Sequence, residues 1–152
     1  MRKIAVLLPI FIGSFFAKAQ YAKINALLDK IEARQGINQY LSKISLEGKR
    51  FVMIEKNTEQ SIRNFLTING AVANYIRVSE DTTGKTTSQI YTGDVVRTED
   101  NILSFRFDRL ENEKIPLPVT KTFLLKSENN ILYLSDVNTR ERWIDEAMLR
   151  PR

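Results

Sequence analysis

The spacing of apolar residues changes along the chain, and each change predicts a different kind of element. Residues 4–16 form an almost unbroken apolar run, whereas residues 21–46 repeat apolar positions every three or four residues. From residue 48 onward the apolar positions recur at every second residue. A period near 3.6 is typical of helices and a period of two is typical of strands. The chain is therefore expected to have a helical front end followed by a β-domain.

Two apolar stripes at helical spacing lie on either side of Gly36. They consist of Ile24, Leu27, Leu28 and Ile31 before the glycine, and of Ile37, Leu41 and Ile44 after it. This pattern predicts two short amphipathic helices, or one helix broken near Gly36. Such a stripe could lie on a membrane or take a partner helix, but it more often covers a sheet of the same chain.

Turn-forming residues divide the rest of the chain into strands. We expect strands at residues 49–57, 60–69, 71–80, 86–97, 101–109, 119–127 and 131–137. Short turns such as Asn69-Gly70 and Asn129-Asn130 connect them, because Asn and Gly tolerate the positive φ of tight hairpins. Neighbours joined in this way pair antiparallel, since parallel strands need long crossover connections. Residues 111–118 are expected to form the longest loop, which Pro116 and Pro118 would make rigid.

Side-chain alternation indicates a curved sheet with a buried side. Leu103, Phe105 and Phe107 share one face of their strand, and polar residues share the other. The hairpin through Asn69-Gly70 carries apolar groups on both faces, so we expect the helices to cover its outer face. Gly93 predicts a bulge or bend. A meander of seven or eight strands avoids exposed edges best by closing into a small barrel.

The tail at residues 140–149 fits two structures. An apolar stripe at helical spacing favours a short helix that closes one end of the barrel; its members are Trp143, Ile144, Ala147 and Met148. A final strand through residues 142–144 is the alternative. The expected fold class is mainly β: an antiparallel meander of about seven to eight strands that forms a small barrel or strongly curved sheet. One or two amphipathic helices precede it and a short C-terminal helix follows it.

The N-terminus has the order of a secretory signal peptide. Arg2 and Lys3 precede the apolar run, and Ala17-Lys18-Ala19 provides an A-x-A cleavage site before Gln20. The run is too short for an ordinary membrane span. We therefore expect residues 1–19 to be a cleaved signal, residues 20–47 a helical segment, and residues 48–152 a barrel-like domain that forms one unit with it. The mature protein would be exported, to the periplasm or outside the cell, without a transmembrane span.

The composition excludes several kinds of chemistry. The 152 residues include no cysteine and no histidine, which rules out disulfides, zinc sites of the Cys or His kind, iron–sulfur clusters, and Ser-His-Asp or Cys-His nucleophiles. Loss of Arg2, Lys3 and Lys18 with the signal takes 23 basic residues to 20, against 18 acidic ones. No basic stripe remains, so no nucleic-acid partner is expected.

Carboxylates are the remaining candidates for catalysis. They cluster at Glu99-Asp100, at Asp108, Glu111 and Glu113, and at Asp145-Glu146. All lie in predicted turns, loops or the charged tail, and we interpret them as solvated charges, because a catalytic acid needs partial burial to tune its pKa. Asp136 and Asn138 form a D-x-N fragment without the glycine and glutamate of an EF-hand loop. We therefore expect no catalytic residue, no metal site and no cofactor.

Aromatic residues spread over successive strands fit either a solid core or a lined cavity. The walls of such a cavity would be Phe105, Phe107, Phe123, Leu125 and Leu134. The exported meander resembles the lipocalin-like (calycin) barrels over residues 48–148, with Gly48-Lys49-Arg50-Phe51 where that family often has G-x-W. The resemblance implies that a small apolar molecule binds inside the barrel.

Two functions from different classes follow. The first is an exported, non-enzymatic barrel that binds a small apolar or lipid-like ligand between its walls. The second is a solid-core envelope interaction module, an inhibitor or assembly factor with a protein partner and no small ligand. A hollow lumen would favour the first and a packed lumen the second. Two close, partly buried carboxylates in a cleft would favour a third function, a carboxylate hydrolase.

Overall fold

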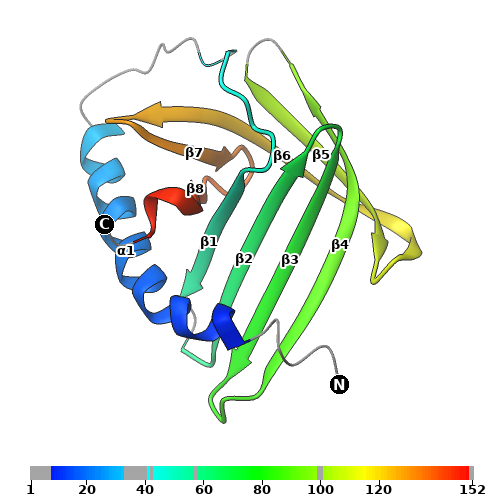
Figure 1. Cartoon of the computed structure of the whole chain (residues 1–152). Coiled ribbons are helices and arrows are strands. Elements are labelled where there is room, and N and C mark those ends of the chain that lie inside the picture. Colours follow the sequence, from blue (N-terminus) through cyan, green and yellow to red (C-terminus); the bar gives the residue numbers. More distant parts are fainter. Residues whose placement is uncertain (1–7, 33–40, 42, 57, 99–100, 151–152) are drawn as a thin grey trace.

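The computed structural model describes residues 8–32, 41, 43–56, 58–98 and 101–150. Eight strands form a closed barrel in which each strand pairs antiparallel with its neighbours in sequence and β8 pairs with β1 (Figure 1). The elements are α1 (Leu8–Glu32), β1 (Arg50–Lys56), β2 (Gln60–Asn69), β3 (Val72–Asp81), β4 (Thr86–Arg97), β5 (Ile102–Leu110), β6 (Glu113–Glu128), β7 (Ile131–Asp136), β8 (Arg142–Asp145) and the short 3-10 turn η1 (Glu146–Met148). The predicted closed antiparallel meander is confirmed.

Tight turns connect the strands through residues with positive φ. Glu128 pairs with Ile131, and Asn129 and Asn130 between them have φ of 49° and 64°. The predicted two-residue turn at Asn129-Asn130 is therefore confirmed. Asn69 pairs with Val72, so the β2–β3 loop is one position later than expected and begins at Gly70, with φ of 62°. The faces of this hairpin are unchanged, because the pairing moves by an even number of residues.

Gly93 marks a bulge in β4, as the sequence predicts. The pairing register with β5 shifts between Thr92 and Gly93. A Cβ atom at Gly93 would lie 1.9 Å from the carbonyl oxygen of Arg106 and 2.6 Å from Cα of Phe107. Only glycine permits this close approach of two backbones, which lets the long strand bend around the barrel.

The expected loop at residues 111–118 is wrong, because most of it belongs to β6. A two-residue turn at Glu111 and Asn112, both with positive φ, leads directly into the strand. Pro116 and Pro118 lie between the pairs Arg109↔Lys114 and Phe107↔Val119, where the register with β5 shifts. Proline has no N–H for a ladder, and a bulge is one of the few places in a sheet that accept it.

The predicted C-terminal helix is also wrong, and the alternative strand is confirmed. β8 pairs antiparallel with β7 along one edge and with β1 along the other, and this pairing closes the barrel. Trp143 points inward and Ile144 outward, and both are fully buried. The strand pairing that closes the barrel therefore decides the structure of these residues, although their apolar spacing also fits a helix. Only η1 follows, with the carboxylate of Asp145 accepting a hydrogen bond from the backbone N–H of Ala147.

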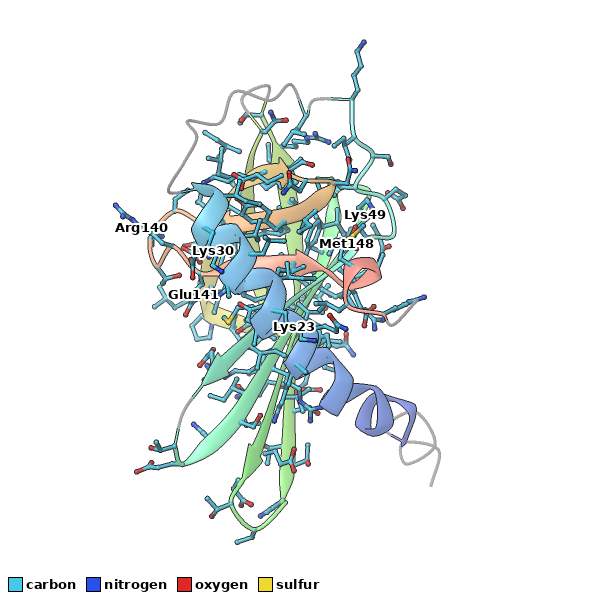
Figure 2. All side chains as sticks on the ribbon, turned by 90° about the vertical axis from the view of Figure 1, so that its left-hand side faces the viewer. Lys23, Lys30, Lys49, Arg140, Glu141 and Met148 are labelled. Carbon is cyan, nitrogen blue, oxygen red and sulfur yellow. The ribbon has the colours of Figure 1, made fainter. Side chains whose placement is uncertain are left out.

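One helix, α1, lies along the outside of the barrel (Figures 1 and 2). It contacts β1 and is hydrogen-bonded to β8 rather than to the β2–β3 hairpin that we expected it to cover. Of the second predicted helix, residues 37–40 and 42 lie outside the described residues, and residues 41 and 43–46 are not helical. Among the described residues no helix is long and apolar enough to cross a membrane. The signal peptide stays a prediction.

Candidate functional site

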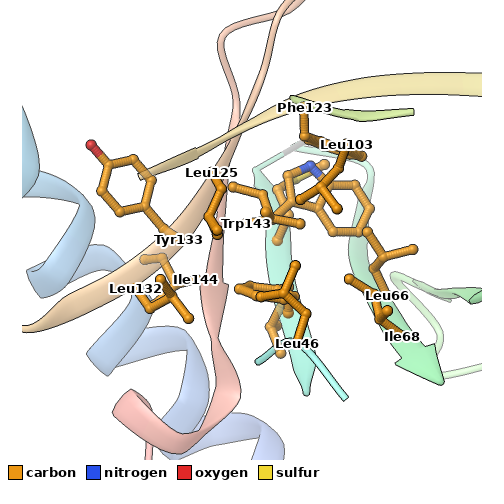
Figure 3. Packing of buried hydrophobic residues seen from close by; sticks show 14 of the residues in the cluster. Leu46, Leu66, Ile68, Leu103, Phe123, Leu125, Leu132, Tyr133, Trp143 and Ile144 are labelled. Carbon is orange, nitrogen blue, oxygen red and sulfur yellow. The ribbon is translucent and has the colours of Figure 1, made fainter. Parts of the chain in front are cut away.

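The five predicted cavity walls all belong to the hydrophobic core of the barrel. Figure 3 shows two of them, Phe123 and Leu125, beside Trp143. The side chains of Phe105, Phe107, Phe123, Leu125 and Leu134 are all at most 2% exposed. The ring centroid of Phe123 lies 5.5 Å from that of Phe105 and 5.4 Å from that of Trp143, both edge-on. Neither of the two pockets described below is lined by any of the five. The centre is thus filled by side chains from facing strands.

Polar side chains occupy the lumen beyond this core, toward the end of β1. Asn64 is fully buried, and its amide nitrogen donates to Oε1 of Glu55 at 3.0 Å. The amide also lies 3.8 Å from the sulfur of Met53, and its oxygen accepts a hydrogen bond of 2.9 Å from the hydroxyl of Tyr75. Both polar atoms of the buried Asn64 side chain therefore have a partner, as buried polar groups usually do.

Tyr75 connects this polar cluster to the aromatic core. Its ring stacks on Tyr91 at 5.4 Å and meets Trp143 edge-on at 5.8 Å. Burial raises the pKa of Tyr75 to about 12; the guanidinium of Arg77 opposes the rise, and the carboxylates of Glu55 and Glu141 add to it. The phenol therefore stays protonated and keeps donating its hydrogen bond at ordinary pH.

Lys121 brings a positive charge to the same place. Its side-chain nitrogen lies 5.5 Å from the ring centroid of Tyr75 and 5.6 Å from that of Trp143. In the part of the chain that the structure describes, the side-chain nitrogen of Lys121 forms no ion pair or hydrogen bond. Lys121 is partly exposed although it pairs with the buried Phe105 and faces the lumen with it. Solvent thus reaches this end of the lumen but not its centre.

An open pocket of about 460 Å³ lies beside this polar end, where β1 and β8 separate. The two strands pair only at Phe51↔Asp145 and Val52↔Ile144. We call the opening the seam pocket; it is lined by Tyr21, Asn25, Met53, Ile54, Glu55, Arg140, Glu141 and Arg142. Arg140 and Glu141 lie next to the second half of α1 (Figure 2). Apolar, aromatic and charged groups of both signs therefore surround one opening.

Helix α1 forms one wall of the seam pocket and is fixed there by Arg142. The guanidinium of Arg142 donates to the side-chain oxygen of Asn25 at 2.9 Å and to Asp29 at 2.6 Å. The hydroxyl of Tyr21 donates to the backbone carbonyl of Arg142 at 2.7 Å, and burial raises its pKa to about 12. The backbone and the side chain of Arg142 thus both hold α1 against β8.

The opposite end of the barrel is closed by the segment before β1. Leu46 is buried there, and the guanidinium of Arg97 donates to the carbonyl oxygens of Leu41 and Ile44, each at 2.6 Å. A smaller pocket of about 240 Å³ remains at this end. Its lining consists of Ser45, Leu46, Glu47, Ile68, Gly70, Val95, Arg97 and Leu103. The guanidinium of Arg97, the cation of this pocket, already donates hydrogen bonds to the segment before β1. We therefore place the candidate site at the seam pocket.

Two of the acidic residues singled out in the sequence, Asp145 and Asp136, stabilise the fold. Asp145, expected to be solvated, is 4% exposed, caps η1 and pairs with the side-chain nitrogen of Lys49 at 2.9 Å. Asp136 accepts hydrogen bonds from the backbone N–H groups of Asn138 and Thr139, which explains the D-x-N fragment as a turn. Residues 99–100 lie outside the described part. Within that part, no group of three or more acidic side chains is placed to hold a metal ion.

The sequence reasoning missed Glu55, Asn64 and Lys121. Lys121 lies two positions before Phe123 and thus on the same face of β6, so strand alternation was the available signal.

Comparison with protein families, curated proteins and solved structures finds no match to this chain. The closed eight-stranded antiparallel barrel is consistent with a calycin-like topology, and membership of the lipocalin-like family stays a prediction.

Proposed function

We propose that this protein is an exported, non-enzymatic barrel that binds a small amphipathic molecule in the seam pocket. One observation carries the proposal: an open pocket of about 460 Å³ beside the polar end of the lumen. Pockets for small molecules typically measure roughly 300–1,000 Å³ and combine apolar walls with a few placed polar groups. Tyr21, Met53 and Ile54 supply apolar surface, and Asn25 and Glu55 supply polar atoms. Export rests on the order of residues 1–19.

The packed centre moves the proposed ligand away from the walls named from the sequence. A molecule between Phe105 and Phe123 would have to displace fully buried rings, and interiors packed like crystals accommodate extra volume poorly. In this proposal Phe107 packs against Tyr75 and Phe123 packs against Trp143, and the ligand contacts the seam.

The test is to identify what the protein carries when it is purified from the envelope of cells that express the full chain. Native mass spectrometry gives the mass of any bound molecule, and an organic extract gives its class. Ile54→Trp places a larger side chain in the pocket lining, and Leu117→Trp places the same group at an exposed site on β6. We expect a stoichiometric ligand in the wild type and in Leu117→Trp and its loss in Ile54→Trp. A ligand that survives Ile54→Trp at full occupancy would contradict the proposal.

A second candidate is the solid-core envelope interaction module, which the filled lumen favours. The rings of Phe105, Phe107, Phe123 and Trp143 form one connected cluster inside the barrel. In this proposal the interior serves stability and the outer surface binds a protein. In that case the purified protein has no bound small molecule, and cross-linking in the envelope yields a defined partner.

A further inference from the structure

We infer that the ligand is a short organic anion whose carboxylate binds Lys121 between the rings of Tyr75 and Trp143, while the rest of the molecule extends into the seam pocket. This inference rests on the proposed function and names the chemical class of its ligand. Its central observation is a cation inside the barrel that contacts two aromatic rings and no carboxylate among the described residues.

Among the described residues no carboxylate pairs with the charge of Lys121, which lies in a place that is only partly solvated. A charged group removed from water costs free energy unless an opposite charge or hydrogen bonds compensate it. The faces of Tyr75 and Trp143 attract the ammonium group, but they accept none of its N–H groups in a conventional hydrogen bond. An anionic ligand would supply both the charge and the acceptor atoms that the site lacks.

The carboxylates nearest to this part of the lumen are engaged elsewhere. Glu55 accepts a hydrogen bond from Asn64 at 3.0 Å and lies 3.9 Å from the guanidinium of Arg77. Glu141 accepts a hydrogen bond of 2.9 Å from the hydroxyl of Thr139. Each therefore has its own partner, and no described carboxylate forms an ion pair with Lys121.

Side-chain contacts connect the lining of the seam pocket to the surroundings of Lys121. Met53 and Glu55 line the pocket and also contact the buried Asn64. Asn64 in turn holds the hydroxyl of Tyr75, whose ring lies under the ammonium group of Lys121. Because the Tyr75 hydroxyl already donates to Asn64, the ammonium group of Lys121 is the charged donor beside the rings of Tyr75 and Trp143.

The packing beyond Lys121 sets the orientation and length of the ligand. Phe107 contacts Tyr75 at a centroid distance of 5.6 Å and Phe123 contacts Trp143 at 5.4 Å, and both phenylalanines are fully buried. A chain longer than the polar end cannot continue into the centre of the barrel. The carboxylate therefore enters first, and the apolar part lies outward against Met53, Ile54 and Tyr21.

Trp143 makes a direct test practical, because it is the only tryptophan of the chain. The probes are hexanoate, hexanol and hexylammonium, which share an alkyl chain and differ in charge. We expect hexanoate to change the fluorescence of Trp143 and to bind at least about tenfold more tightly than the other two, as a charge-assisted pair predicts. Lys121→Met should weaken hexanoate binding about tenfold or more, Lys121→Arg should retain it, and Lys114→Met, an exposed site on the same strand, should leave it unchanged.

The outcomes separate the inference from the proposed function. Equal binding of hexanoate and hexanol, both lost in Ile54→Trp, would overturn the inference that the ligand is an anion. The seam pocket would remain a ligand site. Hexanoate binding unchanged in a folded Lys121→Met variant would also overturn it. If Lys121→Met fails to fold, the three probes on the wild type still decide. A wild type that binds no hexanoate overturns the inference, and native mass spectrometry then tests the proposed function separately.

Discussion

The hydroxyl of Tyr21 donates a hydrogen bond of 2.7 Å to the carbonyl oxygen of Arg142, 121 positions later in the chain. The bond forms at the point where β8 has lost its pairing with β1, so helix α1 supplies a partner that the neighbouring strand does not. The side chain of Arg142 returns to α1 through Asn25 and Asp29. The helix is therefore a structural part of the seam and one wall of the candidate site.

Tyr21 and Tyr75 make stability fall at alkaline pH. Burial raises the pKa of each phenol from 10.0 to about 12 in the folded protein, so the folded state holds these protons more tightly than the unfolded chain. Their contribution is complete below pH 10 and is lost as the pH rises to about 12, by up to about 2–3 kcal/mol for each. We expect Tyr21→Phe and Tyr75→Phe each to flatten this fall, measured by urea unfolding across the pH range. Ionisation of both phenols near pH 10 in the folded protein, followed by ultraviolet absorbance, would contradict this.

Gly93→Ala should destabilise the barrel strongly, because its Cβ would collide with the backbone of β5. We expect a loss of about 3 kcal/mol or more in the free energy of unfolding, the upper range for steric overpacking. Gly84→Ala is the matched control: nothing lies within 4 Å of its Cβ, and only its φ of 83° opposes the change. That variant should lose about 1 kcal/mol. Similar losses for the two, measured by circular dichroism in urea, would argue against the close approach at the bulge.

Phe123→Ala tests whether the centre of the barrel is solid. Removal of a fully buried ring should cost about 3–5 kcal/mol, whereas Leu117→Ala, at a side chain that is 83% exposed, should stay within about 0.5 kcal/mol. The new cavity should also bind a small apolar molecule such as benzene. Calorimetric titration of both proteins checks this, and equally strong benzene binding by the wild type would show that the centre is already hollow.

The pair Lys49–Asp145 should couple strongly for a pair near the surface. Its atoms are 2.9 Å apart and the side chain of Asp145 is 5% exposed, so water screens the interaction less than for exposed pairs. We expect a coupling free energy of about 0.5–2 kcal/mol in a double-mutant cycle of Lys49→Met and Asp145→Asn. The more exposed pair Arg50–Glu146, at 3.5 Å, is the control and should give at most about 0.5 kcal/mol. Equal coupling in the two cycles would contradict the role of burial.

Local patterns predicted most of the strands and turns correctly. The bulge at Gly93 and the turn at Asn129 and Asn130 depend on backbone conformations that only a few residue types adopt, so they can be read from the residues themselves. Residues 142–144 could not be read in this way, because Trp143 and Ile144 fit both a helical stripe and a strand with two buried faces. These residues form a strand because the backbones of β1 and β7 both pair with it.

The candidate site was only partly predictable. Alternation placed Phe105, Phe107 and Phe123 on the inner face, and the structure confirms this orientation. It also places Lys121 on that face, but a single strand gives no information about which rings lie opposite. The contact of Lys121 with Tyr75 and Trp143 joins three separate strands.

The sequence by itself determined that the chain forms an antiparallel meander, where most strands run, and which side chains face inward, because these properties follow from the geometry of each strand and its turns. Only the tertiary structure decided that the centre is filled, that β8 closes the barrel, and that α1 covers the seam. The physical reason is that the distance across a closed barrel depends on the number, tilt and stagger of all its strands together. Whether facing rings touch or leave a cavity is a property of that closure.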